Sequence, residues 1–351
     1  MPTVSFIRYL IPLLLVSLIN ICLTAKAMSA ELPSWNNTAT KSAIVEFVNK
    51  VTQGGSPDFV PPEQRIAVFD NDGTLWAEKP AYFQLLFAID EIKRLAPEHP
   101  EWQKEQPYAA ILNEDISSLL AQGKVGIEKM VGVTHVGVEG SEFNKIVTSW
   151  LSTAKNPLTD KRYRDMVYQP MRELLDYLRD KGFKTFISSG GSADFIRVFS
   201  YDLYGIPPEQ VIGSRLKLRY ENTDGHPRVL TTDKVEFLND RKGKPIGIKQ
   251  VIGHRPIFVA GNSDGDLQML EWSTTGKGPR FGMLIHHTDG KREWAYDRNS
   301  SVGYLDKALL AAKTHGWTVV DMAKDWSIIF PKVKSPSPGK ETQKEPALND
   351  G

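Results

Sequence analysis

The sequence has almost no cysteine and almost no net charge. Cys22 is the only cysteine in 351 residues, and 43 Lys and Arg residues against 42 Asp and Glu residues leave a formal net charge of +1. This charge gives no reason to expect a nucleic acid or an anionic membrane surface as a partner. If Cys22 is removed with an N-terminal leader, the rest of the chain can form no disulfide, thiol nucleophile or thiolate metal site.

The sequence also lacks a hydrophobic run of full membrane-spanning length. Residues 9–23 are nearly all apolar, which is shorter than the roughly 20 residues that cross a bilayer. One positive charge precedes this run, and Ala25 and Ala27 follow it as the small residues of a secretory cleavage site. We therefore expect residues 1–27 to be a cleaved signal peptide and the protein to be periplasmic or secreted, with no stable membrane span. An uncleaved anchor is the alternative.

Apolar spacing, rather than any internal repeat, divides the rest of the chain. Helical spacing predicts a lead helix that begins at the N-cap Thr40 and a long helical stretch after Pro80. Alternating strands and helices with short connections predict an α/β core with a parallel sheet covered on both faces. The expected parts are an N-terminal helical lead (28–60), a core (61–79 and 166–330), a helical insertion (80–165) and a disordered tail (331–351).

The periodicity also predicts the individual elements. The expected strands cover residues 65–70, 183–188, 256–260 and 281–286, with a β-hairpin over 211–238 around Asn222-Thr223-Asp224-Gly225. The expected helices include residues 101–121, 125–131, 141–154, 171–181, 192–203, 246–252, 264–272 and 305–315.

Polar residues cluster where three of these strands end. The segments are Phe-Asp-Asn-Asp-Gly-Thr at 69–74, Phe-Ile-Ser-Ser-Gly-Gly at 186–191 and Val-Ala-Gly-Asn-Ser-Asp-Gly-Asp at 259–266. A basic run, residues 241–245, precedes the third segment. Ligands of parallel α/β sheets bind beyond the carboxyl ends of the strands. If the three strands are neighbours, these side chains meet at one place suited to a phosphate and a hard divalent cation.

Two aspartates at the first strand end indicate that a cation binds there. Asp70 and Asp72 would repel each other and raise each other's pKa. Mg²⁺ takes about six oxygen ligands, and the Asp70 carboxylate and the backbone carbonyl of Asp72 can provide two. The metal would keep Asp70 ionised as a nucleophile, while the Asp72 carboxyl carries a proton to the leaving group and later accepts one from water.

The neighbouring residues supply hydrogen-bond donors and positive charge. Gly73 allows a sharp turn, so that backbone N–H groups at Gly73 and Thr74 can face phosphoryl oxygens. Ser189 and the N–H of Gly190 add donors at the second strand end. Lys244 provides a fixed charge against the negative charge of phosphoryl transfer.

These segments resemble the four motifs of the haloacid dehalogenase (HAD) superfamily. Asp-Asn-Asp-Gly-Thr at 70–74 resembles motif I, and Ser-Gly-Gly at 189–191 is similar to motif II of the phosphoserine-phosphatase-like branch. Lys244 matches motif III, and residues 261–266 resemble motif IV. The resemblance spans about 65–290. It implies a Rossmann-like core with an inserted helical cap, Mg²⁺ dependence and a phosphoaspartyl intermediate on Asp70.

The match departs from the family pattern at one position. Motif IV commonly begins with Gly-Asp, but this chain has Asn262 after Gly261. Asparagine offers a carbonyl oxygen without a charge, so Asn262, Asp264 and Asp266 remain alternatives for completing the metal site with Asp70 and Asp72. Our preferred ligands are Asn262 and Asp266. Lys242 similarly remains an alternative to Lys244.

The sequence therefore predicts an exported, Mg²⁺-dependent phosphomonoesterase acting on a small phosphorylated metabolite. Trp76 and Glu78, at the junction of core and cap, either shape the substrate pocket or only anchor the cap. An alternative is a protein that binds phosphate esters and has lost catalysis, with Asn262 as the lesion. A dehalogenase or phosphonate hydrolase is less favoured, because a halide leaving group needs no proton from Asp72.

A few further polar residues carry weaker predictions. His286 and His287 are adjacent on an expected strand, so their side chains point to opposite faces and do not form a metal pair. Thr134, His135 and the pair Arg162 and Arg164 lie in the predicted cap. They are candidates for leaving-group contacts, although a structural or solvated role is more common for such residues.

Overall fold

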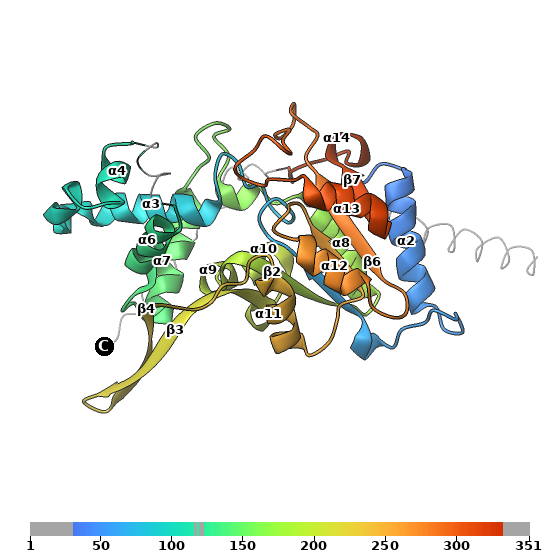
Figure 1. Cartoon of the computed structure of the whole chain (residues 1–351), viewed down its shortest axis with the longest axis horizontal. Coiled ribbons are helices and arrows are strands. Elements are labelled where there is room, and N and C mark those ends of the chain that lie inside the picture. The colour runs from blue at the N-terminus through green and yellow to red at the C-terminus, as the bar shows by residue number, and fades with distance from the viewer. Residues whose placement is uncertain (1–30, 116–117, 119–122, 333–351) are drawn as a thin grey trace, which may run out of the picture.

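The computed structural model describes residues 31–115, 118 and 123–332 (Figure 1). The expected signal peptide and all but two residues of the expected tail lie outside the described residues. Within the described part of the chain, no helix is both long enough and apolar enough to cross a membrane.

A seven-stranded sheet forms the centre of the core. Its order is β4-β3-β2-β1-β5-β6-β7, and all neighbours are parallel except the β3–β4 pair. The strands are β1 (Ile66–Phe69), β2 (Lys184–Ser192), β3 (Val211–Thr223), β4 (His226–Phe237), β5 (Phe258–Gly261), β6 (Phe281–His286) and β7 (Thr318–Asp321). The predicted parallel α/β sheet is therefore confirmed, with β1 at its middle.

Helices cover both faces of the sheet. Ala67 and Phe69 of β1 pack into one apolar cluster with α2 and α8, whereas Ile66 and Val68 pack into another with α11, α12 and α13. This division follows from the alternation of side chains along a strand. The helices are α2 (Ala39–Thr52), α3 (Phe83–Leu95), α4 (Tyr108–Leu112), α6 (Gly123–His135), α7 (Gly140–Thr153), α8 (Gln169–Asp180), α9 (Ala193–Arg197), α10 (Ser200–Tyr204), α11 (Gly243–Ile252), α12 (Leu267–Thr274), α13 (Lys307–His315) and α14 (Met322–Asp325).

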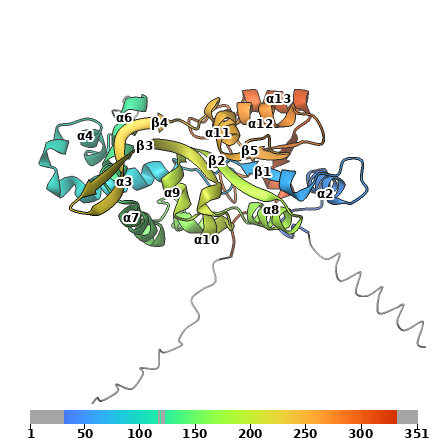
Figure 2. The ribbon, with the colours of Figure 1, turned by 90° about the horizontal axis from the view of Figure 1, so that it is seen from below.

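Between β1 and α8 the chain forms a helical insertion, which we call the cap. It contains α3, α4, α6 and α7 and lies to one side of the sheet in Figures 1 and 2. Aromatic rings join it to the core, because Phe195 of α9 lies 5.3 Å from Phe87 of α3 and 6.4 Å from Trp150 of α7 (ring centroids). A third apolar cluster, which includes Trp102 and Tyr108, lies within the cap itself.

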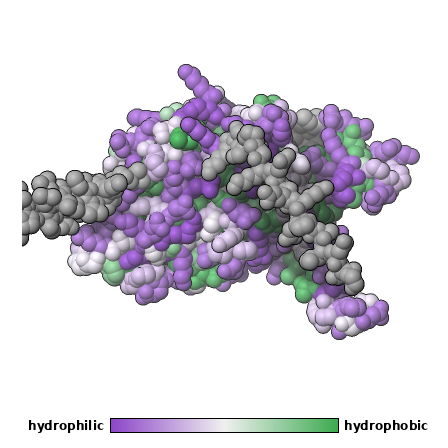
Figure 3. Space-filling model, turned by 180° about the vertical axis from the view of Figure 1, so that it is seen from behind, coloured by the Kyte–Doolittle hydropathy of each residue, from purple (hydrophilic) through white to green (hydrophobic). Residues whose placement is uncertain are grey.

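The β3–β4 hairpin leaves the sheet and reaches the cap. Its turn has Asp224 at φ 53° and Gly225 at φ 78°, the left-handed conformations that a two-residue hairpin turn requires. The carbonyl of Thr231 accepts a hydrogen bond from the N–H of Gly137 at 3.1 Å, next to α6. The tip of the hairpin projects at the lower right of Figure 3 and is mainly hydrophilic.

Several predicted boundaries differ from the structure. The lead helix has Thr38, not Thr40, as its N-cap, since the carbonyl of Thr38 accepts the first helical hydrogen bond from Ser42. Over residues 101–121, Pro107 interrupts the expected helix: the described part holds a 3₁₀ turn at Pro100–Gln103 and then α4.

The expected helix over 192–203 and the C-terminal end of the core also differ. Ser192 ends β2, and α9 and α10 are separate because Phe199 has non-helical angles (φ −122°, ψ −9°) and stacks on Trp76. The short strand β7 and the one-turn helix α14 were not predicted.

Candidate active site

Three loops meet at the carboxyl edge of the sheet. β1 pairs in parallel with β2 and with β5, and its last residue, Phe69, is in register with Ile187 and Ala260. Asp70 follows directly, and its N–H donates to the carbonyl of Ala260 at 2.9 Å. The first and third predicted segments are therefore tied together by a backbone hydrogen bond, and the second ends on the other side of β1.

The loop after β1 is a tight turn that only glycine permits at its centre. The carbonyl of Asn71 accepts a hydrogen bond from the N–H of Leu75 at 2.8 Å. Gly73 has φ +76°, and a Cβ at this position would collide with the side chains of Asn262 and Glu78. The turn therefore requires Gly73 both for its left-handed backbone and for the close approach of these two side chains.

Lys244 joins Asp70 to Asp266. Its ammonium Nζ lies 2.5 Å from Oδ1 of each aspartate, and its side chain is 3% exposed. Burial alone lowers the pKa of Lys244, but the two carboxylates outweigh this effect and raise the pKa above its usual value. Lys242, the sequence alternative, is exposed. Of the two lysines, only Lys244 contacts Asp70.

The three motif IV alternatives have distinct partners. Oδ2 of Asp266 accepts hydrogen bonds from the backbone N–H groups of Asn262 (3.0 Å) and Ser263 (3.1 Å), so Asp266 shapes the loop as well as holding Lys244. Oδ1 of Asp264 instead accepts from backbone N–H groups at the start of α13, among them that of Ala308 at 2.9 Å. Asp264 therefore caps a helix, and Asn262 and Asp266 remain at the site.

Asp72 is positioned separately from Asp70. The indole Nε1–H of Trp76 donates to its Oδ1 at 2.8 Å, and the Ser189 hydroxyl lies 3.5 Å from its Oδ2. The Ser189 oxygen also accepts from the N–H of Gly191 at 3.0 Å. Burial raises the pKa of Asp72, and the hydrogen bond from Trp76 opposes part of this rise. A raised pKa favours a carboxyl that carries a proton.

Asn262 lies between Thr74 and Glu78. Its amide oxygen accepts from the Thr74 hydroxyl at 3.1 Å, and its amide nitrogen donates to Oε1 of Glu78 at 2.8 Å. The hydroxyl of Tyr296 donates to the same Glu78 oxygen at 2.8 Å. Burial raises the pKa of Glu78 well above its usual value, and the nearby charges of Asp72 and Asp70 raise it further.

The edge holds more negative than positive charge. Four carboxyl groups, those of Asp70, Asp72, Glu78 and Asp266, lie at this edge. The buried cation Lys244 contacts Asp70 and Asp266, and the half-buried Lys79 lies near Glu78. Burial, followed by the charge of Asp266, raises the pKa of Asp70 well above its usual value, while Lys244 opposes this rise. A bound cation would relieve this repulsion.

The donors at this edge suit a hard divalent cation. The Asp70 carboxylate, the Asp72 backbone carbonyl and the Asn262 amide oxygen are all oxygen donors, which Mg²⁺ prefers. No group of three or more His, Cys, Asp or Glu side chains in the described residues is arranged as a metal cluster. A magnesium site here would therefore combine carboxylate with amide and backbone oxygens, a combination common for Mg²⁺ with retained waters.

The residues predicted to contact substrate divide by exposure. Gly190 is exposed at the end of the second segment. Thr74 and Trp76 are 0% exposed and Glu78 is 1% exposed. These three side chains form hydrogen bonds with Asn262 or Asp72 and so position these residues.

His287 contacts the turn after β1, although no functional role was predicted for it. Its Nε2 lies 2.8 Å from the carbonyl oxygen of Gly73, and its Nδ1 lies 3.2 Å from Oε2 of Glu293. His286 lies 3.5 Å from Asp297, so the two histidines have separate partners. His287 directly follows the last residue of β6, the strand that pairs with β5. This place in the sequence is the signal that indicates a position near the edge.

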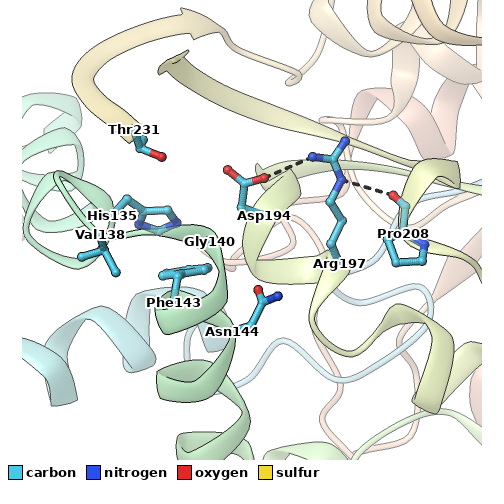
Figure 4. A pocket seen from close by; sticks show the side chains of 9 residues that line it. All are labelled: His135, Val138, Gly140, Phe143, Asn144, Asp194, Arg197, Pro208 and Thr231. Carbon is cyan, nitrogen blue, oxygen red and sulfur yellow. Dashed lines mark hydrogen bonds and ion pairs between the residues drawn. The ribbon is translucent and has the colours of Figure 1, made fainter. Parts of the chain in front are cut away.

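A separate cavity of about 290 Å³ lies where the cap meets α9 and β4 (Figure 4). Its lining residues are His135, Val138, Gly140, Phe143, Asn144, Asp194, Arg197, Pro208 and Thr231. Arg197 pairs with Asp194 at 3.1 Å, as the dashed line in Figure 4 shows. Of the predicted cap contacts, only His135 lines this cavity, and Arg162 pairs with Asp165 at 2.7 Å.

Solved structures of low sequence identity resemble parts of the chain. A conserved protein of unknown function from Anaerococcus prevotii is 17% identical, with a TM-score of 0.47 over 75% of this chain and 89% of that one. A phosphoserine phosphohydrolase-like protein from Francisella tularensis is 16% identical, with a TM-score of 0.36 over 71% and 98%. TM-scores below 0.5 are too low for these names to indicate the activity of this chain.

The family comparison covers the site itself. No curated protein matches the sequence. The family of haloacid dehalogenase-like hydrolases matches residues 67–271, which include Asp70, Ser189, Lys244 and Asn262. This match extends over more than half of the chain, and it agrees with the parallel sheet and the order of the loops at its edge. The chain belongs to the haloacid dehalogenase-like hydrolase family.

Proposed function

We propose that the protein is an exported, Mg²⁺-dependent phosphomonoesterase of the phosphoserine-phosphatase-like branch that acts on a small phosphorylated metabolite. One observation carries the proposal: the two aspartates of the first loop have different partners. Asp70 lies against the Lys244 ammonium, whereas Asp72 receives hydrogen bonds from Trp76 and Ser189. The Lys244 ammonium favours the anion of Asp70, whereas burial raises the pKa of Asp72 and favours a carboxyl that carries a proton.

In the first step, a carboxylate oxygen of Asp70 attacks the phosphorus atom. An aspartyl-phosphate bond forms and the ester P–O bond breaks. Asp72 gives its proton to the departing alkoxide, so that the products are an alcohol and the phosphorylated Asp70. Lys244 lies against Asp70 and Asp266 and stabilises the negative charge of the phosphoryl group.

In the second step, water hydrolyses the aspartyl-phosphate. Asp72, now ionised, takes a proton from the attacking water, the bond between Asp70 and phosphorus breaks, and inorganic phosphate leaves. Ser189 and the N–H of Gly190 would bind the phosphoryl oxygens. The backbone N–H groups of Gly73 and Thr74, which the sequence predicts in the same role, instead donate to the carbonyl oxygens of Trp76 at 2.8 Å and Asn71 at 3.2 Å.

Asp70, the Asp72 carbonyl and Asn262 would hold Mg²⁺, with Asp266 beside them. When bound, the cation supplies charge neutralisation and orientation of the phosphate. Asp266 has both oxygens engaged by Lys244 and the 262–263 backbone. The Asn262 amide oxygen accepts one hydrogen bond, from the Thr74 hydroxyl at 3.1 Å, and keeps a second lone pair. This difference supports Asn262, rather than Asp266, as the motif IV oxygen that faces the cation. Export follows from the expected signal peptide, and N-terminal sequencing of protein recovered from a periplasmic fraction tests it.

The direct test measures phosphate release from p-nitrophenyl phosphate by the mature chain, in excess Mg²⁺ and in EDTA. We expect release that requires Mg²⁺ and that falls by a factor of ~10⁴ or more in Asp70→Asn, because the nucleophile is lost. Wild-type rates in Asp70→Asn would refute the covalent mechanism. Mg²⁺-dependent binding of phosphate esters without any phosphate release would support the alternative of a binding protein.

A further inference from the structure

Asn262 is the departure from the family pattern, and its side chain faces a buried carboxyl. Its amide nitrogen donates to Oε1 of Glu78 at 2.8 Å, while its oxygen accepts from Thr74 at 3.1 Å. The hydroxyl of Tyr296 donates to the same oxygen of Glu78. Oε1 of Glu78 therefore accepts two hydrogen bonds, which a carboxylate can do, and a bound cation nearby would favour the ionised form.

Glu78 comes from the end of the loop that begins with Asp70. It is 1% exposed and packs so closely against Gly73 and Gly303 that a Cβ on either glycine would collide with it. The side chain of its neighbour Lys79 turns away, and its ammonium binds the carbonyl of Val302 at 3.0 Å. Glu78 therefore accepts hydrogen bonds from Asn262 and Tyr296, two neutral donors, and lies near Asp70 and Asp72.

We propose that Glu78 and Asn262 act as one unit, in which Asn262 presents an oxygen to the divalent cation and Glu78 supplies the negative charge that asparagine lacks. The proposal rests on the metal dependence of the proposed function. A carboxylate that accepts from the amide N–H₂ polarises the amide and makes its oxygen a stronger ligand, as outer partners do for metal-ligating side chains. Glu78 is then a positioning residue that acts through Asn262.

The test measures Mn²⁺ binding to the mature chain by electron paramagnetic resonance, with Mg²⁺ as competitor and no substrate. Glu78→Gln keeps an acceptor oxygen for Asn262 and Tyr296 and removes only the charge. We expect it to raise the Kd for Mn²⁺ about 10–100-fold. Glu91→Gln is the matched control, since Glu91 is also a buried glutamate but lies in α3 of the cap, where it pairs with Arg94. It should bind Mn²⁺ as the wild type does.

The second variant tests the unit itself. Asn262→Asp returns a carboxylate to the family position, so the double variant Glu78→Gln/Asn262→Asp should bind Mn²⁺ within about threefold of wild type, a strongly non-additive result. In the single variant Asn262→Asp two carboxyls face each other, and the melting temperature in EDTA should fall below that of the double variant. A purely structural role of Glu78 predicts no recovery of metal binding in the double variant.

The outcomes separate this inference from the proposed function. Unchanged Mn²⁺ binding in Glu78→Gln, or weak binding that Asn262→Asp does not restore, overturns the Glu78 proposal and leaves the phosphatase intact. Absence of Mn²⁺ binding in the wild type overturns both. Tight, Glu78-dependent Mn²⁺ binding in a protein that releases no phosphate supports the Glu78–Asn262 unit and refutes the phosphatase.

Discussion

The carboxyl edge of the sheet and the cap cavity are built on different principles. At the edge, buried charged groups contact one another directly, as in the pair of 2.5 Å contacts that Lys244 makes with Asp70 and Asp266. In the cap cavity, the side chains of the ion pair between Arg197 and Asp194 are 39% and 43% exposed. Backbone turns at strand ends therefore position the reactive groups of the edge, whereas the faces of helices line most of the cap cavity. Substitutions at the edge should change catalysis, and those in the cavity should change binding at most.

The largest expected effect after loss of Asp70 is that of Asp72→Asn. Without a proton for the alkoxide, we expect hydrolysis of an alkyl phosphate to fall by ~10²–10⁴-fold. An aryl phosphate needs less protonation, so its first step should be affected far less. Stopped-flow measurement should then show a burst of nitrophenol close to one equivalent of enzyme, followed by slow turnover. Equal losses for both esters, without a burst, would contradict the role of Asp72 as general acid.

A paired comparison of the two lysines comes next. Lys244→Ala leaves Asp70 and Asp266 without their cation, so we expect a loss of ~10²–10³-fold in kcat and a loss of about 3–5 kcal/mol in unfolding free energy. Lys242→Ala, at an exposed position of the same basic run, should keep kcat within about twofold. Chemical denaturation and steady-state kinetics on both variants check this. A larger loss of kcat in Lys242→Ala than in Lys244→Ala would show that Lys242, and not Lys244, fills the motif III role.

Much of this edge could be predicted because its pieces are local signals. An apolar run ending in Asp70-Asn71-Asp72-Gly73 identifies both a strand and the residues that follow it, and the parallel order of the sheet then brings Lys244 and Asn262 to the same place. Glu78, by contrast, was predicted only as a pocket or anchor residue. Its contact with Asn262 joins positions 184 residues apart, and no spacing rule specifies such a pair.

The errors in the fold also come from contacts between residues far apart in the sequence. Phe199 was expected to continue a helix, but its ring stacks on Trp76 with centroids 4.6 Å apart, and the backbone breaks there. β7 is four residues long, too short for alternation to be distinguished from a loop. Tertiary packing decided the first case, and sheet pairing with β6 decided the second.

The charge imbalance at the edge predicts how stability depends on pH and metal. The pKa values of Asp70, Asp72 and Glu78 are raised above their ordinary values of 3.8, 3.8 and 4.5. The folded protein therefore holds protons that the unfolded chain has lost, so unfolding free energy in EDTA should fall as pH rises above about 4.5. Because a cation requires the ionised groups, Mg²⁺ should raise the melting temperature by a few degrees more near pH 8 than near pH 5.

Differential scanning fluorimetry with and without Mg²⁺ measures this effect. Asp70→Asn, which lacks one of the three carboxyls, should show a shallower fall in EDTA and a smaller gain with Mg²⁺. A melting temperature in EDTA that rises from about pH 5 to about pH 8 would contradict the charge imbalance that distinguishes this edge.

The smallest expected effect is in the cap cavity. Asn144 is an exposed residue on α7 that lines the cavity, and none of the lining residues contacts Asp70, Asp72 or Lys244 in the part of the chain that the structure describes. Asn144→Ala should therefore leave kcat for p-nitrophenyl phosphate within about twofold. If the cavity binds leaving groups, KM for larger esters should change while kcat does not, because only uniform binding is lost. A fall in kcat comparable to that of Lys244→Ala would show that edge and cavity form a single catalytic unit, and the contrast between them would no longer hold.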